Sequence, residues 1–334
     1  MKILITGGAG FIGSNFIKYI FKKQPDWQVV NLDKLTYAGN LESLKEIEND
    51  PNYKFVKGDI ASAKDVERAI DEGVDKIINY AAETHVDRSI ISPDAFIKTD
   101  IFGTYTLLEA VKKYRVAQYI QISTDEVFGS VKNGSFTEES PFAPNSPYSA
   151  SKAGADHLCR AYFKTYNLPI MVTHSCNVFG LNAHPEKMIP LFITNLLEGK
   201  KVPLYGQGQQ VREWIFAQDH CAAIETIIEK GQSGEVYNIG TGFEKTNLET
   251  TKFILQEMRL GEDKIEYIKD RLGHDWRYAI NSQKLRGLGW QPGVSWEEGL
   301  RRTIKWYQEN ETWWKCIKSG DYLEYYRNQY GKKN

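Results

Sequence analysis

The sequence lacks the features of proteins built around disulfides, metals or membranes. Its 334 residues include only four cysteines, which are far apart and form no C-x-x-C pair, so we expect reduced thiols. The six histidines show no H-E-x-x-H or similar ligand spacing, and we expect no metal site. No run of 18 apolar residues occurs, and the apolar start at residues 1–6 is too short for a signal-peptide core. We therefore expect a cytoplasmic protein.

An excess of charge of one sign is also lacking. The chain has 42 Lys and Arg against 43 Asp and Glu, a formal net charge of −1, so no overall field attracts nucleic acid or an anionic membrane. A local basic pocket for a diphosphate is still compatible with this balance. Hydrophobic residues make up 41% and charged residues 25%, which is ordinary for a globular enzyme of two lobes around one cleft.

Short β-rich runs alternate with amphipathic helical patterns through the first half of the chain. Residues 11–22 and 101–114 place their apolar side chains on one helical face. Strands that alternate with helices form parallel sheets covered on both faces. We therefore predict an α/β fold, a Rossmann-type doubly wound parallel sheet, with strands at residues 2–6, 28–32, 54–57, 76–80, 118–123 and 170–174.

The alternation becomes irregular after about residue 175, where prolines and glycines break it. Helical patterns persist at 189–197 and 246–260, and 235–239 is compatible with one more strand. We predict a cofactor-binding lobe at residues 1–175, with returns near 210–240, and a smaller mixed α/β substrate-binding lobe at 176–334. The aromatic tail at 306–330 is expected to pack as a final helix on the smaller lobe.

A glycine-rich turn directly follows the first expected strand and opens the first helix. Gly7, Gly10 and Gly13 form G-x-x-G-x-x-G, which lets the backbone approach a pyrophosphate at a helix N-terminus. Asp33 ends the second strand, 20 residues after Gly13. A carboxylate there can accept both hydroxyls of an adenine ribose and would repel a 2′-phosphate, so the predicted cofactor is NAD. Asp59, after the third strand, either meets the adenine or is an ordinary turn acid.

Two further motifs carry groups suited to proton transfer. Tyr148 and Lys152 form Y-x-x-x-K at the start of a helical run, about one turn apart on one face. A nearby ammonium favours the phenolate, which is otherwise too weakly acidic to act as a base at neutral pH. The alternative is an amphipathic helix with an incidental Tyr and Lys. Residues 124–126, Thr-Asp-Glu, end the fifth strand and are either a solvated turn or an acid and base pair with separated protonation states.

With these motifs in place, the chain resembles the extended short-chain dehydrogenase/reductases over essentially its whole length. It is most similar to the dTDP-glucose 4,6-dehydratase family. The Thr-Asp-Glu triplet distinguishes these dehydratases from the related epimerases and decarboxylases. The matching segments are residues 6–13, 81–89, 123–129, 148–152, 185–187, 205–206 and 271–278.

The resemblance implies a complete reaction cycle on one hexose. Tyr148, assisted by Lys152 and Thr124, takes the C4 hydroxyl proton while a hydride passes from C4 to NAD. Glu126 then removes the acidified C5 proton, and Asp125 protonates the leaving C6 hydroxyl. The hydride returns to C6, which gives a 4-keto-6-deoxy sugar nucleotide and regenerates NAD.

The resemblance also implies the remaining binding residues. Those expected to hold the cofactor are Gly7, Gly10, Phe11, Ile12, Gly13, Asp33, Lys34, Asp59, Ile60, Ala81, Ala82, Thr99, Tyr148, Lys152, Asn177 and Val178. Those expected to hold the substrate are His85, Ser89, Thr124, Asn177, Glu186, Lys187, Asn195, Tyr205, Arg212, Asn247, Arg271, His274, Arg277 and Tyr278. Arg212 and Arg277 are expected at the diphosphate, with surface ion pairs as the alternative. The family further implies a homodimer through a four-helix bundle from residues 95–114 and 148–166.

Some positions depart from the family pattern near the expected sugar pocket. Residues 175–184 lack one of two usual asparagines, Trp276 replaces a usual Arg, and Glu213 replaces a usual Asp. Because these changes could make room at the sugar C2, UDP-glucose and UDP-N-acetylglucosamine are alternative substrates. A sugar-nucleotide 4-epimerase is a second alternative, and an NAD-binding sensor without chemistry is a third.

Overall fold

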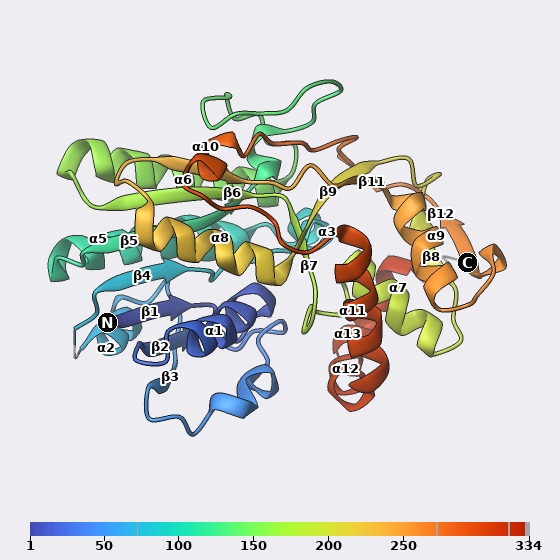
Figure 1. Ribbon diagram of the computed structural model, residues 1–334, viewed down its shortest axis with the longest axis horizontal. Helices are drawn as coiled ribbons and strands as arrows, with labels where there is room; N and C mark the ends of the chain where they lie inside the picture. Colours follow the sequence, from blue (N-terminus) through green and yellow to red (C-terminus); the bar gives the residue numbers. More distant parts are fainter. Residues whose placement is uncertain (72, 272, 320, 331–334) are drawn as a thin grey trace.

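The computed structural model describes residues 1–71, 73–271, 273–319 and 321–330. Leu272 of the 271–278 segment and the last four residues of the predicted smaller lobe lie outside this range. Figure 1 shows two lobes side by side, the larger containing the N-terminus and the smaller the C-terminal helices. No helix of the described ranges combines the length and the apolar character needed to cross a membrane.

The larger lobe is built on one seven-stranded sheet in the order β10-β6-β5-β4-β1-β2-β3, and every pairing in it is parallel. The predicted doubly wound parallel sheet is therefore confirmed. Its strands are β1 (Lys2–Thr6), β2 (Gln28–Asp33), β3 (Tyr53–Lys57), β4 (Lys76–Asn79), β5 (Gln118–Thr124), β6 (Ile170–Ser175) and β10 (Val236–Ile239).

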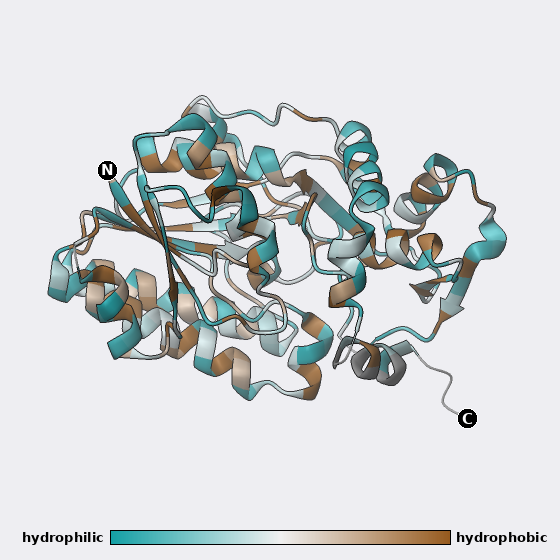
Figure 2. Ribbon diagram, turned by 90° about the horizontal axis from the view of Figure 1, so that it is seen from below, coloured by the Kyte–Doolittle hydropathy of each residue, from teal (hydrophilic) through white to brown (hydrophobic). Residues whose placement is uncertain are grey.

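Helices cover both faces of this sheet, as Figure 2 shows in a view along its layers. One face packs against α1 (Phe11–Lys23) and α8 (Ala217–Lys230), and the other against α2 (Ala63–Ile70), α5 (Thr104–Tyr114) and α6 (Pro147–Tyr166). Because both faces are covered, the strands β1, β2, β5 and β6 are buried along almost their whole length. The shorter helical elements are η1 (Leu41–Ile47), α3 (Val86–Ile91), α4 (Asp94–Phe96), the π-helix η2 (Ile97–Gly103), η3 (Asp125–Phe128) and α10 (Gln283–Gly287).

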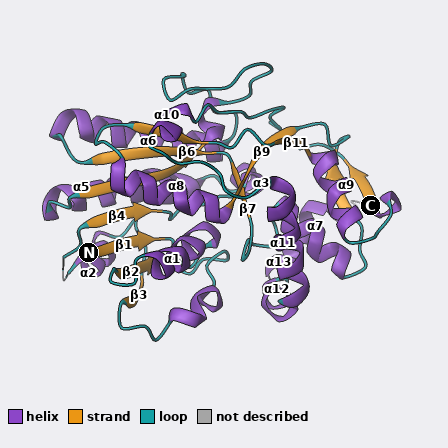
Figure 3. Cartoon of the chain, in the orientation of Figure 1, coloured by secondary structure: helices purple, strands orange, loops and turns teal. Residues whose placement is uncertain are grey.

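The smaller lobe contains two small sheets and several helices (Figure 3). One sheet joins β7 (Asn177–Phe179), β9 (Val211–Phe216) and β11 (Glu244–Thr246), and the other joins β8 (Val202–Tyr205) to β12 (Ile265–Ile268). A separate apolar core lies beneath them. Its helices are α7 (Met188–Leu197), α9 (Asn247–Glu257), η4 (Glu262–Lys264), α11 (Trp296–Glu309), α12 (Glu311–Ile317) and α13 (Asp321–Tyr330). The aromatic tail thus forms several helices rather than one.

The chain passes between the lobes more than once. After β9 it returns through α8 and β10, which pairs with β6 in the large sheet. It then re-enters the smaller lobe at β11. These crossings bring the carboxyl ends of the large sheet's strands against the smaller lobe, where open parallel sheets bind their ligands.

Candidate active site

A cavity of about 410 Å³ lies at the carboxyl ends of the large sheet's strands and is lined by residues of both lobes. It begins where β1 stands between β2 and β4, the point at which the strand order reverses. It continues past β5 and α6 to the smaller lobe. The cavity therefore includes residues suited to a dinucleotide site, a reaction centre and a substrate site.

The glycine turn at the start of α1 forms one end of the cavity. Gly7 has a φ of +66°, and a Cβ there would lie 2.6 Å from the backbone nitrogen of Ala81. A Cβ on Gly13 would lie 2.3 Å from the carbonyl oxygen of Gly7. Phe11 and Ile12 line the cavity in the first turn of α1, which has no side-chain cap. This cradle of backbone N–H groups fits a pyrophosphate.

Asp33 lies beside this turn with its side chain buried. Its carboxylate accepts the backbone N–H of Ala9 at 2.9 Å and that of Leu35 at 2.7 Å. Burial raises the pKa of Asp33, and these two hydrogen bonds act against the rise. The remaining lone pairs of the carboxylate suit two ribose hydroxyls. Asp59 accepts the N–H of Ala61, as expected of a turn acid, and it also lines the cavity and pairs with Lys34 at 2.8 Å.

The first turn of α6 positions the tyrosine and lysine. Ser146 caps the helix in a capping box with Ser149, and Pro147 starts it, so Tyr148 enters the cavity from a fixed turn. Lys152 follows one turn later and donates to the carbonyl oxygen of Ile122 at 2.7 Å. Burial, followed by neighbouring carboxylates, raises the pKa of Tyr148 well above its ordinary value. Deprotonation of this phenol therefore requires compensating positive charge in the cavity.

The two acids after β5 have different surroundings. Burial, reinforced by Glu126 and Glu213, raises the pKa of Asp125 well above its ordinary value. Its Oδ2 atom has no hydrogen-bond partner among the described residues, so it is available to a ligand. Burial also raises the pKa of Glu126, but here nearby cations oppose the rise, namely Arg271, Arg212 and Lys187. The surroundings therefore favour the protonated form of Asp125 more than that of Glu126, which suits an acid and base pair.

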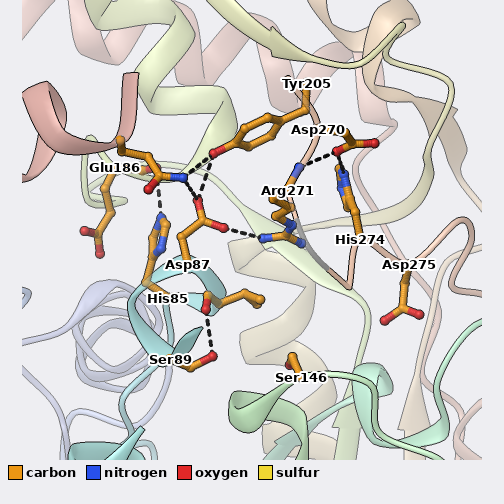
Figure 4. Close-up of polar contacts among 12 residues, drawn as sticks. His85, Asp87, Ser89, Ser146, Glu186, Tyr205, Asp270, Arg271, His274 and Asp275 are labelled. Carbon is orange, nitrogen blue, oxygen red and sulfur yellow. Dashed lines mark hydrogen bonds and ion pairs between the residues drawn. The ribbon is translucent and has the colours of Figure 1, made fainter. Parts of the chain in front are cut away.

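The far end of the cavity is rich in basic and aromatic side chains. The Arg212 guanidinium lies 4.4 Å from the centre of the Tyr278 ring and donates to two backbone carbonyl oxygens. Tyr278 donates to Asp275 at 2.7 Å and reaches Glu126 at 3.5 Å. Figure 4 shows Arg271 near Asp87, with which it forms an ion pair of 3.0 Å. Two guanidinium groups beside the reaction centre suit the diphosphate of a sugar nucleotide.

The structure brings together every predicted catalytic and cofactor-binding residue, because all of them line this cavity. Three predicted substrate residues do not line it: Ser89, Asn195 and Arg277. Ser89 is buried in α3 and donates to the Val86 carbonyl. Asn195 is buried in α7 and donates to the Tyr326 hydroxyl. Arg277 forms a bidentate ion pair with Glu244, which is the alternative considered for it.

Two of the positions that depart from the family pattern, Trp276 and Glu213, lie outside the cavity. The Trp276 side chain is 53% exposed and does not line the cavity. Glu213 is buried and accepts the backbone N–H groups of Thr241, Gly242 and Ile280. Neither of these two side chains therefore borders the cavity. Residues that the sequence did not single out include Tyr330, which lines the cavity from the last turn of α13, and Asp100, which lies behind α6.

Comparison with known proteins identifies the family. A family model described as GDP-mannose 4,6 dehydratase matches residues 4–303. The chain belongs to this family. The dehydratase resemblance seen in the motifs is confirmed, since a dTDP-glucose 4,6-dehydratase of Streptomyces niveus is 46% identical over 96% of this chain and 97% of its own.

Two further relatives match nearly the full chain. The low-salt glycan biosynthesis protein Agl12 of Haloferax volcanii is 49% identical over 92% of this chain and 98% of its own. The crystal structure of a dTDP-glucose 4,6-dehydratase from Bacillus anthracis in complex with NAD is 49% identical. It superposes with a TM-score of 0.89 and covers 95% of this chain and 99% of that chain.

Proposed function

We propose that the protein is an NAD-dependent dTDP-glucose 4,6-dehydratase. The observation that carries the proposal is the convergence of Tyr148, Asp125 and Glu126 on one cavity whose other end is a dinucleotide cradle. A dehydrogenase alone needs the tyrosine, and water loss needs the two carboxyl groups as well. The dehydratases of Streptomyces niveus and Bacillus anthracis, which match nearly the whole chain, support this reaction and this nucleotide.

The first step is oxidation at the sugar C4. Tyr148 accepts the proton of the C4 hydroxyl, and the Thr124 hydroxyl stabilises the phenolate, because a hydrogen bond from Thr124 lowers the Tyr148 pKa. The Ile122 carbonyl accepts a hydrogen bond from Lys152, which holds this side chain in place one turn after Tyr148 on α6. When bound, NAD would supply the hydride acceptor and donor, and its positively charged nicotinamide ring would offset the carboxylates around Tyr148.

The second step is loss of water across C5 and C6. The 4-keto group makes the C5 proton acidic, and Glu126 accepts it as a carboxylate. Asp125 is kept protonated by burial and by Glu126, and it donates its proton to the C6 hydroxyl, which leaves as water. When the double bond is reduced at C6, Glu126 returns its proton to C5. The product is a 4-keto-6-deoxy sugar. Tyr148 releases the proton of the C4 hydroxyl to water and Asp125 takes one proton up from water, so both groups return to their starting states.

The nucleotide and sugar are tested by a substrate panel. We expect turnover of dTDP-glucose with a mass loss of about 18 daltons, one water, and no net accumulation of NADH. UDP-glucose, UDP-N-acetylglucosamine and GDP-mannose are the matched alternatives. Preferred turnover of any of these would replace the proposed substrate. Conversion of a sugar nucleotide to its C4 epimer without mass change would identify an epimerase, and NAD binding without turnover of any substrate would identify a sensor.

We also propose a homodimer built from α5 and α6 of each chain. Four aromatic or aliphatic side chains of 41% to 50% exposure lie on η2, α5 and the end of α6, namely Ile97, Phe102, Tyr105 and Tyr166. Burying such a patch against a second copy would remove it from water. Light scattering should show a dimer that Phe102→Asp converts to a monomer, while the equally exposed Tyr267→Asp in β12 should leave it intact. A monomeric parent protein would refute this assembly.

The proposed setting and lobe boundaries follow from the same features. All four cysteines are free, and three of them are buried, which suits a reducing compartment such as the cytoplasm. We retain residues 1–175, with the return through α8 and β10, as the cofactor-binding lobe. The rest of the described chain, apart from α10, which packs on the large sheet, then forms the substrate-binding lobe.

A further inference from the structure

The last turn of the C-terminal helix reaches the far end of the cavity. Tyr330 lines the cavity, and its ring centre lies 6.3 Å from that of Tyr205. Gln329, the residue before it, donates through its side-chain amide to the Tyr205 hydroxyl at 2.6 Å and to Asp87 at 3.2 Å. A segment more than 200 residues away in sequence thus contacts α3 directly.

Asp87 is the centre of this contact. Its buried carboxylate accepts hydrogen bonds from Arg271 at 3.0 Å, from Tyr205 at 3.1 Å and from Gln329 at 3.2 Å. The donors come from the 269–274 segment, β8 and α13, so three separate parts of the smaller lobe are fixed to one carboxylate of the larger lobe. Figure 4 shows Asp87 between Tyr205 and Arg271.

The Arg271 side chain that this network holds has capacity left for a ligand. One of its terminal nitrogens donates to Asp87, whereas its buried Nε atom has no hydrogen-bond partner among the described residues. An unpartnered buried N–H is costly unless a ligand satisfies it. Arg271 lines the cavity close enough to influence Glu126, and with Arg212 it forms the basic end suited to a diphosphate.

The rest of α13 is anchored so that its last turn is held in place. Tyr322 donates to the carbonyl oxygen of Pro185 at 3.2 Å, and the Tyr326 hydroxyl accepts the Asn195 amide at 3.0 Å. These residues and Gln329 recur at helical spacing, so one face of α13 lies along the substrate lobe. Asn195, predicted from the sequence to line the pocket, acts here through α13 instead.

We propose that Gln329 is a positioning residue for the substrate's nucleoside diphosphate and that Tyr330 closes that end of the cavity. Gln329 fixes Asp87 and Tyr205, and Asp87 directs the remaining N–H groups of Arg271 toward the ligand. The inference rests on the proposed function, since it assigns the diphosphate of that substrate to this end. It assigns α13 a role in binding and none in the proton transfers at Tyr148 and Glu126.

The test compares ligand binding with turnover in variants of the full-length protein. Calorimetry gives the Kd of dTDP, and steady-state kinetics give KM and kcat for dTDP-glucose. Gln329→Ala should raise both Kd and KM about tenfold, because it removes a hydrogen bond to a charged group, and should change kcat less than about twofold. Gln329→Glu should raise them further by placing a second carboxylate beside Asp87. Tyr330→Ala should weaken binding more than Tyr330→Phe, which keeps the ring.

The matched control is Leu323→Ala, since Leu323 is exposed on the same helix. It should leave Kd, KM and kcat unchanged, and NAD affinity should stay constant in every variant because the glycine turn lies at the other end of the cavity. Unchanged Kd and KM in Gln329→Ala would overturn the inference, as would a fall in kcat with KM unaltered. If the unmodified protein bound no dTDP, the proposed substrate itself would be refuted. This outcome differs from one in which the unmodified protein binds dTDP and Gln329→Ala binds it equally well, which would refute only the inference about Gln329.

Discussion

A buried acid behind the catalytic helix provides a quantitative test of the electrostatics around Tyr148. Asp100 lies in the π-helix η2 and is 1% exposed. Its carboxylate accepts the Ser151 hydroxyl at 2.6 Å and the Glu83 N–H at 3.1 Å. Burial raises the pKa of Asp100 from 3.8 to about 6, although Lys152 and these hydrogen bonds act against the rise. The perturbation we consider is Asp100→Asn, which has the same shape.

The side-chain amide of the Asp100→Asn variant can hydrogen-bond to the same neighbours as the carboxylate. Its oxygen can accept the Glu83 N–H, and its NH₂ can donate to the Ser151 oxygen while that hydroxyl donates to the Tyr148 carbonyl, a contact already present at 2.8 Å. The substitution therefore removes the titration of Asp100 with little loss of hydrogen bonding. Any pH-dependent difference between the two proteins then reports on the buried charge.

The expected magnitude follows from the two pKa values. A carboxyl whose pKa is higher in the native protein than in the unfolded chain binds more protons in the native state between pH 3.8 and about 6. Its contribution to stability is therefore present below pH 3.8 and is lost as the pH rises through about 6. The difference between those values corresponds to about 3 kcal/mol. Asp100→Asn should thus gain up to about 3 kcal/mol over the parent protein between pH 4 and pH 7.

The assay is denaturant unfolding of both proteins across that pH range, with the exposed Asp26→Asn as the control for a general loss of charge. A constant difference between Asp100→Asn and the parent protein at all pH values would refute the reasoning. Because Asp100 also raises the pKa of Tyr148, the variant should keep its dehydratase activity to lower pH. An acid limb of the pH–rate profile that does not move would contradict this second consequence.

Other predictions address the reaction and the cofactor. Glu126→Gln should abolish water loss while C4 oxidation continues, so NADH should accumulate on the enzyme as absorbance at about 340 nm; undiminished dehydration would exclude Glu126 as the base. Tyr148→Phe should lower kcat about 10²- to 10⁴-fold with dTDP binding unchanged by calorimetry, and a small loss would assign the first proton transfer elsewhere. Gly13→Val should abolish NAD binding, because its Cβ would lie 2.3 Å from the Gly7 carbonyl; equilibrium dialysis with NAD that shows normal affinity would contradict the cradle.

The local patterns of the sequence predict the large sheet and the reaction centre well. The first strand is found exactly at residues 2–6, and the other expected strands differ from the observed ones by about one residue at their ends. The catalytic groups are also predictable, since the Tyr–Lys spacing and the Thr-Asp-Glu triplet each lie within one turn or strand end. Such features depend on periodicity and chain neighbours, which the sequence displays directly.

Contacts between distant segments are what the sequence does not reveal. Gln329 and Asp87 are 242 positions apart, and neither carries a local signal that indicates the other. Arg277 was expected at the diphosphate, but it pairs with Val211 of β9, and Glu244 of the neighbouring strand β11 binds its guanidinium instead. The burial of Asp100, which determines its pKa, likewise depends on the packing of η2 against α6. These properties arise only when segments distant in the sequence pack together.

The most direct test of the central claim follows a deuterium atom through one turnover. We would incubate the protein and catalytic NAD with dTDP-glucose that carries deuterium at C4, in ordinary water, and locate the label in the product by mass spectrometry and NMR. Our account predicts a product lighter by one water, with the deuterium at C6 and none left at C4. Deuterium that remains at C4 of an epimer, or an unchanged sugar after long incubation, would contradict it.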